Sequence, residues 1–190
     1  MPTGDETTGT LIREGTDRDM VTIQDIYAHH VLEGLASFEE TPPDVAEMTR
    51  RRDAILDAGY PYLVAETTGM TGGMIGGTLG GFAYAAAYRS RPAYRYTVEN
   101  SVYVSLDSQR QGFGRRLLQD LIDRCTDLGF RQMIAIIGDS ANASSIGLHA
   151  RLGFEKTAVQ PSVGFKFGGW VDQVIMQRPL GDGDKTLPIS

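Results

Sequence analysis

The sequence is poor in the features that mark secreted, membrane or nucleic-acid-binding proteins. Its single cysteine, Cys125, has no partner for an internal disulfide, and its place in an apolar helical stripe predicts a buried packing role. There is no apolar run long enough to cross a bilayer, and residues 1–10 lack the basic and apolar regions of a secretory signal. A formal net charge of −6 disfavours nucleic acid and favours cationic amines as partners. We therefore expect a cytoplasmic protein with neither nucleic-acid nor membrane partners.

Two common phosphate-binding motifs are also missing. The segment QRQGFG, residues 109–114, lies between an expected strand and an expected helix. A dinucleotide fingerprint would need a third glycine where Leu117 stands, and a P-loop would need a lysine after its glycine. The remaining pattern is a glycine turn whose backbone N–H groups, backed by the positive end of a helix, can hold a pyrophosphate. Arg110, Arg115 and Arg116 add positive charge to this turn.

Hydrophobic periodicity and turn residues predict one α+β domain over residues 11–180, between flexible tails at 1–10 and 181–190. The expected strands are 11–14, 62–66, 80–88, 97–105, 132–137, 155–159 and 171–177. The expected helices are 16–32, 44–58, 113–128 and 142–152. The glycine-rich linker 67–81 is expected to form a mobile hairpin loop.

The glycine turn resembles the acyl-CoA-binding turn of the GNAT acetyltransferase superfamily, and the order of elements resembles a complete GNAT domain. A narrower similarity rests on the short motifs ASFE (36–39), RPAY (91–94), TVENSVYV (97–104), NASS (142–145) and GGW (168–170). These motifs are similar to the phosphinothricin N-acetyltransferase family, which includes enzymes acting on methionine sulfoximine and methionine sulfone. The resemblance implies a GNAT fold: a mixed, mostly antiparallel sheet of about seven strands, splayed at strands 4 and 5 and flanked by about four helices.

The same resemblance implies that the chain transfers an acetyl group from acetyl-CoA to the α-amine of a small amino acid analogue, without a metal and as a homodimer. Such an enzyme would detoxify an inhibitor of the glutamine-synthetase type. The residues that would bind the cofactor by this similarity are Val102, Tyr103, Val104, Arg110, Gln111, Gly112, Phe113, Gly114, Arg115, Asn142 and Ser145.

Two residues match the catalytic positions of the family. Glu99 would deprotonate the acceptor amine, through a water, and His149 would act as its partner acid or base. Read without the resemblance, Glu99 is equally compatible with a cross-strand salt bridge. His149 is likewise compatible with a core histidine bonded to a backbone carbonyl.

The family resemblance also implies a substrate-binding set, namely Phe38, Glu39, Arg89, Arg91 and Tyr94, with Arg95 nearby. The arginines can equally solubilise a loop. We interpret the pair His29–His30 and the run Arg50–Arg52 as solvated helix surface. The chain departs from the family pattern at residues 67–81 and 89–90, so the preferred amino acid stays open.

Two alternatives remain at this point. The chain could acetylate another amine, such as a polyamine, an aminoglycoside or a protein N-terminus; the arginine cluster disfavours strongly cationic acceptors, whereas the acidic composition favours them. It could also be an acyl-CoA sensor that binds the cofactor without turnover.

Overall fold

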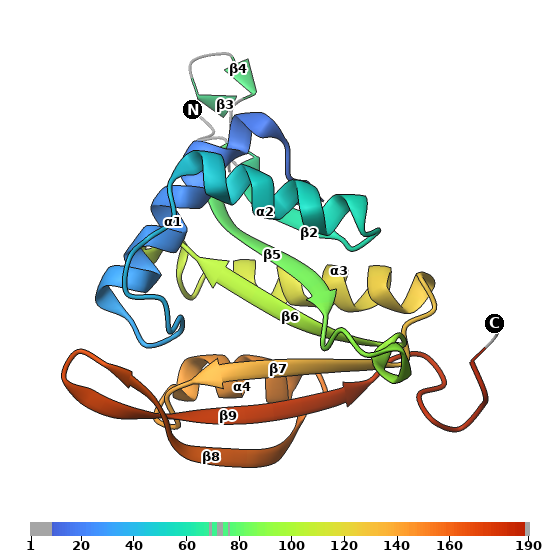
Figure 1. Cartoon of the computed structure of the whole chain (residues 1–190). Helices are drawn as coiled ribbons and strands as arrows, with labels where there is room; N and C mark the ends of the chain where they lie inside the picture. The colour runs from blue at the N-terminus through green and yellow to red at the C-terminus, as the bar shows by residue number, and fades with distance from the viewer. Residues whose placement is uncertain (1–8, 69, 72–73, 76, 189–190) are drawn as a thin grey trace, which may run out of the picture.

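The computed structural model describes residues 9–68, 70–71, 74–75 and 77–188 (Figure 1). Within them, a seven-stranded sheet has the order β1-β2-β5-β6-β7-β9-β8. Neighbouring strands are antiparallel except β6 and β7, which are parallel. This arrangement confirms the predicted α+β class and the mixed sheet. The strands are β1 Gly9–Glu14, β2 Tyr62–Thr68, β5 Leu79–Ala87, β6 Thr97–Val104, β7 Gln132–Gly138, β8 Glu155–Lys166 and β9 Gly169–Pro179.

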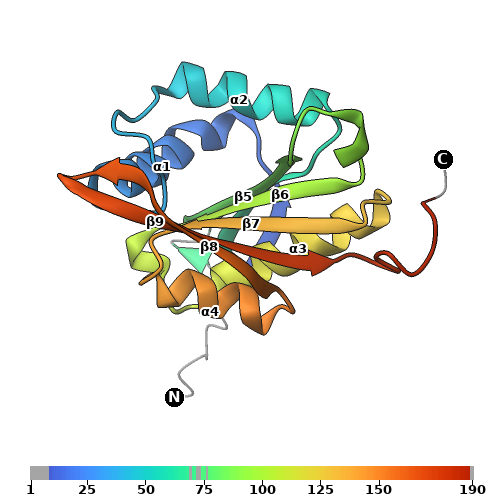
Figure 2. The same ribbon diagram turned by 60° about the horizontal axis from the view of Figure 1, so that its bottom comes forward.

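Helices cover both faces of the sheet. Figure 2 shows α1 (Met20–Glu33) and α2 (Val45–Asp57) on one side and α3 (Phe113–Asp127) and α4 (Ala143–Arg151) on the other. Successive side chains of β2 point to opposite faces of the sheet, so β2 contributes to the hydrophobic cores on both sides. Tyr62 and Val64 belong to the core cluster under α1 and α2, and Leu63 and Ala65 belong to the core cluster under α3. Cys125 is buried in the α3 cluster, as predicted.

The ends of the chain and the glycine-rich linker differ from the sequence-based expectation. Gly9 and Thr10, assigned to a flexible tail, pair with Thr68 and Thr67 as the first residues of β1. At the other end, Gly183 N–H donates to the Leu180 carbonyl at 2.9 Å, within a series of turns. Residues 1–8 and 189–190 lie outside the described residues. The expected loop 67–81 holds the end of β2, the small hairpin of β3 (Met70–Thr71) and β4 (Met74–Ile75), and the start of β5, and residues 69, 72–73 and 76 lie outside the described ones.

The last two strands are longer than the predicted 155–159 and 171–177. They run over Glu155–Lys166 and Gly169–Pro179 and form a hairpin. β8 is an edge strand whose side chains are exposed almost throughout, so it has no alternation of apolar and polar residues to detect. The pairing register also shifts between Gln160 and Gly164, around Pro161, which an edge strand tolerates.

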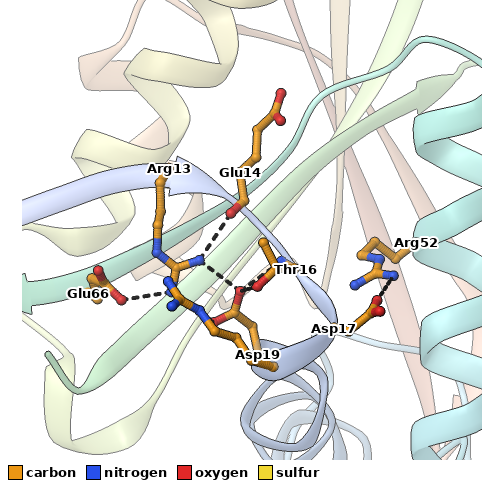
Figure 3. A network of polar contacts seen from close by, with 8 residues as sticks. Arg13, Glu14, Thr16, Asp17, Asp19, Arg52 and Glu66 are labelled. Atoms are coloured by element: carbon orange, nitrogen blue, oxygen red, sulfur yellow. Dashed lines mark hydrogen bonds and ion pairs between the residues drawn. The ribbon is translucent and has the colours of Figure 1, made fainter. Parts of the chain in front are cut away.

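A partly buried ion-pair network joins β1 and β2 to the start of α1 (Figure 3). Arg13 donates to both carboxylate oxygens of Asp19 at 2.7 and 2.8 Å and to Glu66 at 2.7 Å. Asp19 also accepts from the backbone and hydroxyl of Thr16, at 2.7 and 2.8 Å. Burial by itself would raise the pKa of Asp19, but the hydrogen bonds from Arg13 and Thr16 outweigh it and lower the pKa from 3.8 to about 2.

The run Arg50–Arg52 is solvated surface only in part: Arg50 is exposed, as the sequence suggested, whereas Arg51 is half-buried and Arg52 is buried. Arg52 is buried and pairs with Asp17, ahead of α1 (Figure 3). It also pairs with its neighbour Asp53 at 2.6 Å. Arg51 pairs with Glu39 at 2.7 Å. Both arginines therefore fasten α2 to the segments on either side of α1.

We expect Asp19→Asn to lower the free energy of unfolding by about 2 kcal/mol at pH 7, because Arg13 then loses the carboxylate to which it makes two hydrogen bonds and keeps only Glu66 as a charged partner. The pKa of Asp19 is lower in the folded chain, so its contribution is present above pH 3.8 and disappears as the pH falls toward 2. Urea unfolding at a series of pH values measures this difference. Asp123→Asn, at an exposed site, is the matched control; a deficit that persists unchanged at pH 2 would contradict the assignment.

Candidate active site

The candidate site begins where the parallel strands β6 and β7 separate. Their pairing extends only from Thr97–Asn100 against Gln132–Ala135, although β6 continues to Val104 and β7 to Gly138. We call the point after Asn100 and Ala135 the fork. A cavity of about 50 Å³ lies there, lined by residues of β6, β7 and α4. Beyond the fork, both strands have backbone groups that do not pair with each other.

A larger cavity of about 680 Å³ lies between the end of β6, the glycine turn and the start of α4. Val102, Tyr103, Asn142 and Ser145 line both this cavity and the small one, so the two adjoin. All the residues expected to bind the cofactor line the larger cavity, except Gln111. The Gln111 side chain donates instead to the Asp107 carbonyl at 2.6 Å.

Glycine gives the turn its shape. Gly112 has φ 87°, in the left-handed region, and a Cβ there would meet no atom within 4 Å. Phe113, the first residue of α3, is buried and anchors the turn. The backbone N–H groups that follow it lie in the first turn of α3, where N–H groups have no hydrogen-bond partner within the helix. A Cβ on Gly114 would lie 3.3 Å from Leu148 and 3.4 Å from Val104. The turn thus offers open space and free amides to an anion.

His30 belongs to this cavity, which the sequence did not predict. It lines the wall and its Nε2 lies 3.0 Å from the Val104 carbonyl oxygen, while burial lowers the pKa of the ring. The interpretation of His29–His30 as a solvated helix end is therefore wrong for His30. Its partner lies on β6, so no local sequence signal could have found the contact.

His149 is buried at the fork and bonded through both ring nitrogens. Its Nδ1 lies 2.8 Å from the Ser145 carbonyl, and its Nε2 lies 3.0 Å from Oδ1 of Asn100. The Nδ2 of Asn100 donates to the Ile134 carbonyl on β7 at 3.0 Å. Asn100 therefore joins β6, β7 and α4, although the sequence analysis did not single it out.

The donors and acceptors around His149 define its chemistry. The Ser145 carbonyl only accepts, and Asn100 presents an acceptor because its amide donor is used on Ile134. Only a ring with protons on both nitrogens satisfies every contact, whereas burial lowers the pKa of His149 and favours the neutral ring. Burial thus favours the neutral ring, while Oδ1 of Asn100 is placed to accept a hydrogen bond from a proton on Nε2.

Glu99 lies on the opposite face of the sheet. Because strand residues alternate, Asn100 points toward α4, whereas Glu99 shares its face with Ser101 and with Tyr84 of β5. Burial raises the pKa of Glu99 above its ordinary value. The two predicted catalytic residues therefore lie on opposite sides of β6, next to the fork.

The predicted substrate-binding residues come from two segments, the loop after α1 and the turn between β5 and β6. Glu39 is paired with Arg51 and accepts from the Tyr27 hydroxyl at 3.2 Å, and Arg89 stacks over Tyr94 at 5.8 Å. Arg91 caps the 3-10 turn Pro92–Tyr94, and the ring of Phe38 lies against Gly138 and Gly164. None of these five predicted residues lines either cavity described above.

Lys166, at the end of β8, holds the loop that carries Phe38. The Lys166 side chain is buried, and its Nζ donates to the carbonyls of Val31, Gly34 and Ser37 at 2.7, 2.8 and 2.7 Å. An ammonium bound to carbonyls at the end of a helix also complements the helix dipole. The last hairpin therefore fixes the segment after α1.

Among the described residues, no helix is long and apolar enough to cross a membrane. The same part of the chain contains no group of three or more His, Cys, Asp or Glu side chains that could hold a metal ion.

Comparison with known proteins shows that the chain is similar to acetyltransferases. The model of the acetyltransferase (GNAT) family matches residues 23–154. The phosphinothricin N-acetyltransferase of Alcaligenes faecalis is 54% identical over 93% of this chain and 86% of its own length. An L-methionine sulfoximine/L-methionine sulfone acetyltransferase of Salmonella typhimurium is 40% identical over 90% of this chain and 95% of its own. The crystal structure of a GNAT superfamily phosphinothricin acetyltransferase from Sinorhizobium meliloti, in complex with AcCoA, has a TM-score of 0.87 and 46% identity, covering 95% of this chain and 94% of that one.

We expect Asn100→Leu to lower the pKa of His149 further, because leucine cannot accept a hydrogen bond from the protonated ring. The variant should also be less stable by about 1–3 kcal/mol, since the Ile134 carbonyl loses its donor. An NMR titration of the His149 ring measures the first effect, with His149→Gln identifying its resonance. An unchanged or raised pKa would show that Asn100 does not support the second proton.

Proposed function

The chain belongs to the GNAT acetyltransferase family, and from this premise we propose that it transfers the acetyl group of acetyl-CoA to the α-amine of a small amino acid analogue. Acceptors of the phosphinothricin, methionine sulfoximine or methionine sulfone type are the proposed class, because relatives of 54% and 40% identity carry those names. The observation that carries the proposal is the 680 Å³ cavity between the free edge of β6 and the glycine turn.

The residues present fit acetyl-CoA. Gly112 leaves open space beside the first amides of α3, and Arg110 and Arg115 line the same cavity. These groups would hold the diphosphate, while Val102, Tyr103 and Val104 would offer backbone groups to the amide-containing arm. Asn142 and Ser145 would form the far wall. When bound, acetyl-CoA supplies the acetyl thioester.

Glu99 is the proposed base. An α-ammonium group must lose a proton before its nitrogen can attack a carbonyl. Burial raises the pKa of Glu99, which brings the carboxylate closer to the basicity that this proton transfer needs. A water between Glu99 and the amine would relay the proton.

His149 is the proposed partner acid or base. It would hold a proton at Nε2, the nitrogen that faces Asn100, and exchange it with the leaving thiolate when that contact opens. A backbone amide near Val104 would stabilise negative charge on the carbonyl oxygen. Arg89, Arg91 and Tyr94 would bind the acidic groups of the acceptor, and Phe38 and Glu39 would close the opposite wall.

We further propose a homodimer, supported by the exposed apolar side chains of the last hairpin. Phe165 and Trp170 face each other across β8 and β9 and are 56% and 71% exposed, with Val163 and Phe167 nearby also exposed. A second copy of the chain would cover this surface. The proposed setting is the cytoplasm, in keeping with the lone buried Cys125, and the proposed role is resistance to an amino acid inhibitor.

We expect Gly112→Ala to weaken acetyl-CoA binding by roughly tenfold, because the added methyl group projects into the space proposed for the diphosphate. Gly59→Ala is the matched control, since Gly59 has a similar φ of 80° and open space around its Cβ. Both variants carry the strain of a left-handed residue, about 1–2 kcal/mol. Calorimetry should show weaker binding for Gly112→Ala alone; parent-like binding would remove the turn from the site.

We expect Glu99→Gln to lower kcat by roughly 10²–10⁴-fold while acetyl-CoA binding stays unchanged. In the parent, kcat should rise with pH through the raised pKa of Glu99, and the variant should lose that rise. Thiol release from acetyl-CoA with phosphinothricin, methionine sulfoximine and methionine sulfone measures both effects, and Glu155→Gln at the exposed edge serves as control. A parent chain that binds acetyl-CoA but releases no thiol with any amine would favour the sensor alternative.

A further inference from the structure

The His30 side chain joins the last turn of α1 to the end of β6. Its Nε2 lies 3.0 Å from the Val104 carbonyl oxygen, and its ring packs against Tyr103 with 5.4 Å between the ring centres. A carbonyl oxygen only accepts, so Nε2 carries the proton and donates. The ring also lines the large cavity, and burial lowers its pKa and favours the neutral form. A helix on the face of the sheet opposite α3 and α4 thus contacts the cofactor cavity (Figure 2).

The register of β5 and β6 shows which backbone groups of β6 face the opening. Ser105 N–H donates to the Gly80 carbonyl at 2.9 Å, and hydrogen-bonded and non-hydrogen-bonded positions alternate along an antiparallel pair. Val104 and Val102 occupy the alternate positions, so their N–H and C=O groups point away from β5. The strand on that side, β7, pairs with β6 only up to the fork. These groups form the free edge of β6, and His30 binds one of them, the Val104 carbonyl.

The bond from His30 lies at the junction between the two parts of the proposed cofactor site. The peptide unit after Val104 is held at both ends, because its carbonyl accepts from His30 and its N–H, that of Ser105, donates to β5. The chain then passes through the 3-10 turn Leu106–Ser108 to Gly112, the N-cap of α3. The free edge of β6 therefore lies before this peptide unit, and the glycine turn lies after it.

A ligand that spans both parts binds best when their spacing is already set. Acetyl-CoA would place its amide-containing arm along the free edge and its diphosphate at the glycine turn. Without His30 the Val104 carbonyl loses its donor, and the peptide unit at the junction is held at one end only. Binding would then have to order the junction as well. The Val104 N–H belongs to the preceding peptide unit, whose carbonyl faces β5, so groups that act on the reacting atoms should not be affected.

We propose that His30 is a positioning residue for the cofactor: its Nε2–H holds the Val104 carbonyl and so keeps the free edge of β6 and the glycine turn at the spacing that acetyl-CoA needs. His30 acts through Val104, and its imidazole takes no proton from the reacting groups. The inference rests on the proposed function and adds to it a residue of α1.

The test compares His30→Leu, which fills the space without a donor, with His30→Gln, whose side-chain amide can donate in place of Nε2. His30→Leu should raise the Kd and the KM for acetyl-CoA about three- to tenfold, the loss expected for one neutral hydrogen bond. Its kcat and its KM for phosphinothricin or methionine sulfone should stay within twofold of the parent. His30→Gln should bind acetyl-CoA within twofold of the parent.

His29→Leu is the matched control, because it makes the same change on the neighbouring residue, which does not line the large cavity. Thermal unfolding confirms that each variant is folded, and nitrogen NMR of the parent ring should show the proton on Nε2. A proton on Nδ1 instead, an equal loss for His30→Leu and His30→Gln, or parent-like acetyl-CoA binding by His30→Leu overturns the inference alone. A parent that does not bind acetyl-CoA in the calorimeter overturns the proposed function together with the inference.

Discussion

The hydrogen bond from Asn100 to the Ile134 carbonyl is the contact on which the site depends. It joins β6 to β7 at the last paired residues, and beyond it the strands separate. The same side chain presents its oxygen to His149, so the end of the pairing and the position of the imidazole are set together. A side chain that only packed would remove the side-chain donor from the Ile134 carbonyl and the partner from Nε2 of His149, both in a buried place. One amide thus joins the two strands where their pairing ends and holds the imidazole at the opening.

Next to this opening, successive side chains of β6 point to opposite faces of the sheet, so they meet two different sets of residues. Residues on one face of β6 meet α3 and α4, where the glycine turn and the large cavity lie. Residues on the other face, Glu99 among them, meet the tyrosines under α1 and α2. In the proposed reaction the cofactor and the acceptor would meet at the fork, and the large cavity there also includes His30 of α1 in its wall.

The sequence predicts those parts of the structure that depend on residues close together in the chain. The apolar stripe of α3 and the glycine turn before it were placed correctly, because period and turn chemistry act within a few residues. What it missed depends on distant partners: His30 meets Val104, Lys166 meets the end of α1, and Tyr62 lines a cavity formed by α1, α2, β2 and β5. The length of β8 was also missed, since an exposed edge strand carries no burial pattern. The roles of Glu99 and His149 remain predictions drawn from resemblance, with a geometry that supports them.

The ammonium of Lys166 has a consequence for how the protein is made. The wall formed by the segment after α1 is near the beginning of the chain, but the group that binds its carbonyls comes from the last hairpin. A ribosome releases the N-terminal part first, and the loop then has no cation to hold it. The nascent chain must therefore wait for its final strands before this wall takes shape, so that a polypeptide truncated ahead of residue 166 would carry the glycine turn and lack the cation that orders the segment after α1.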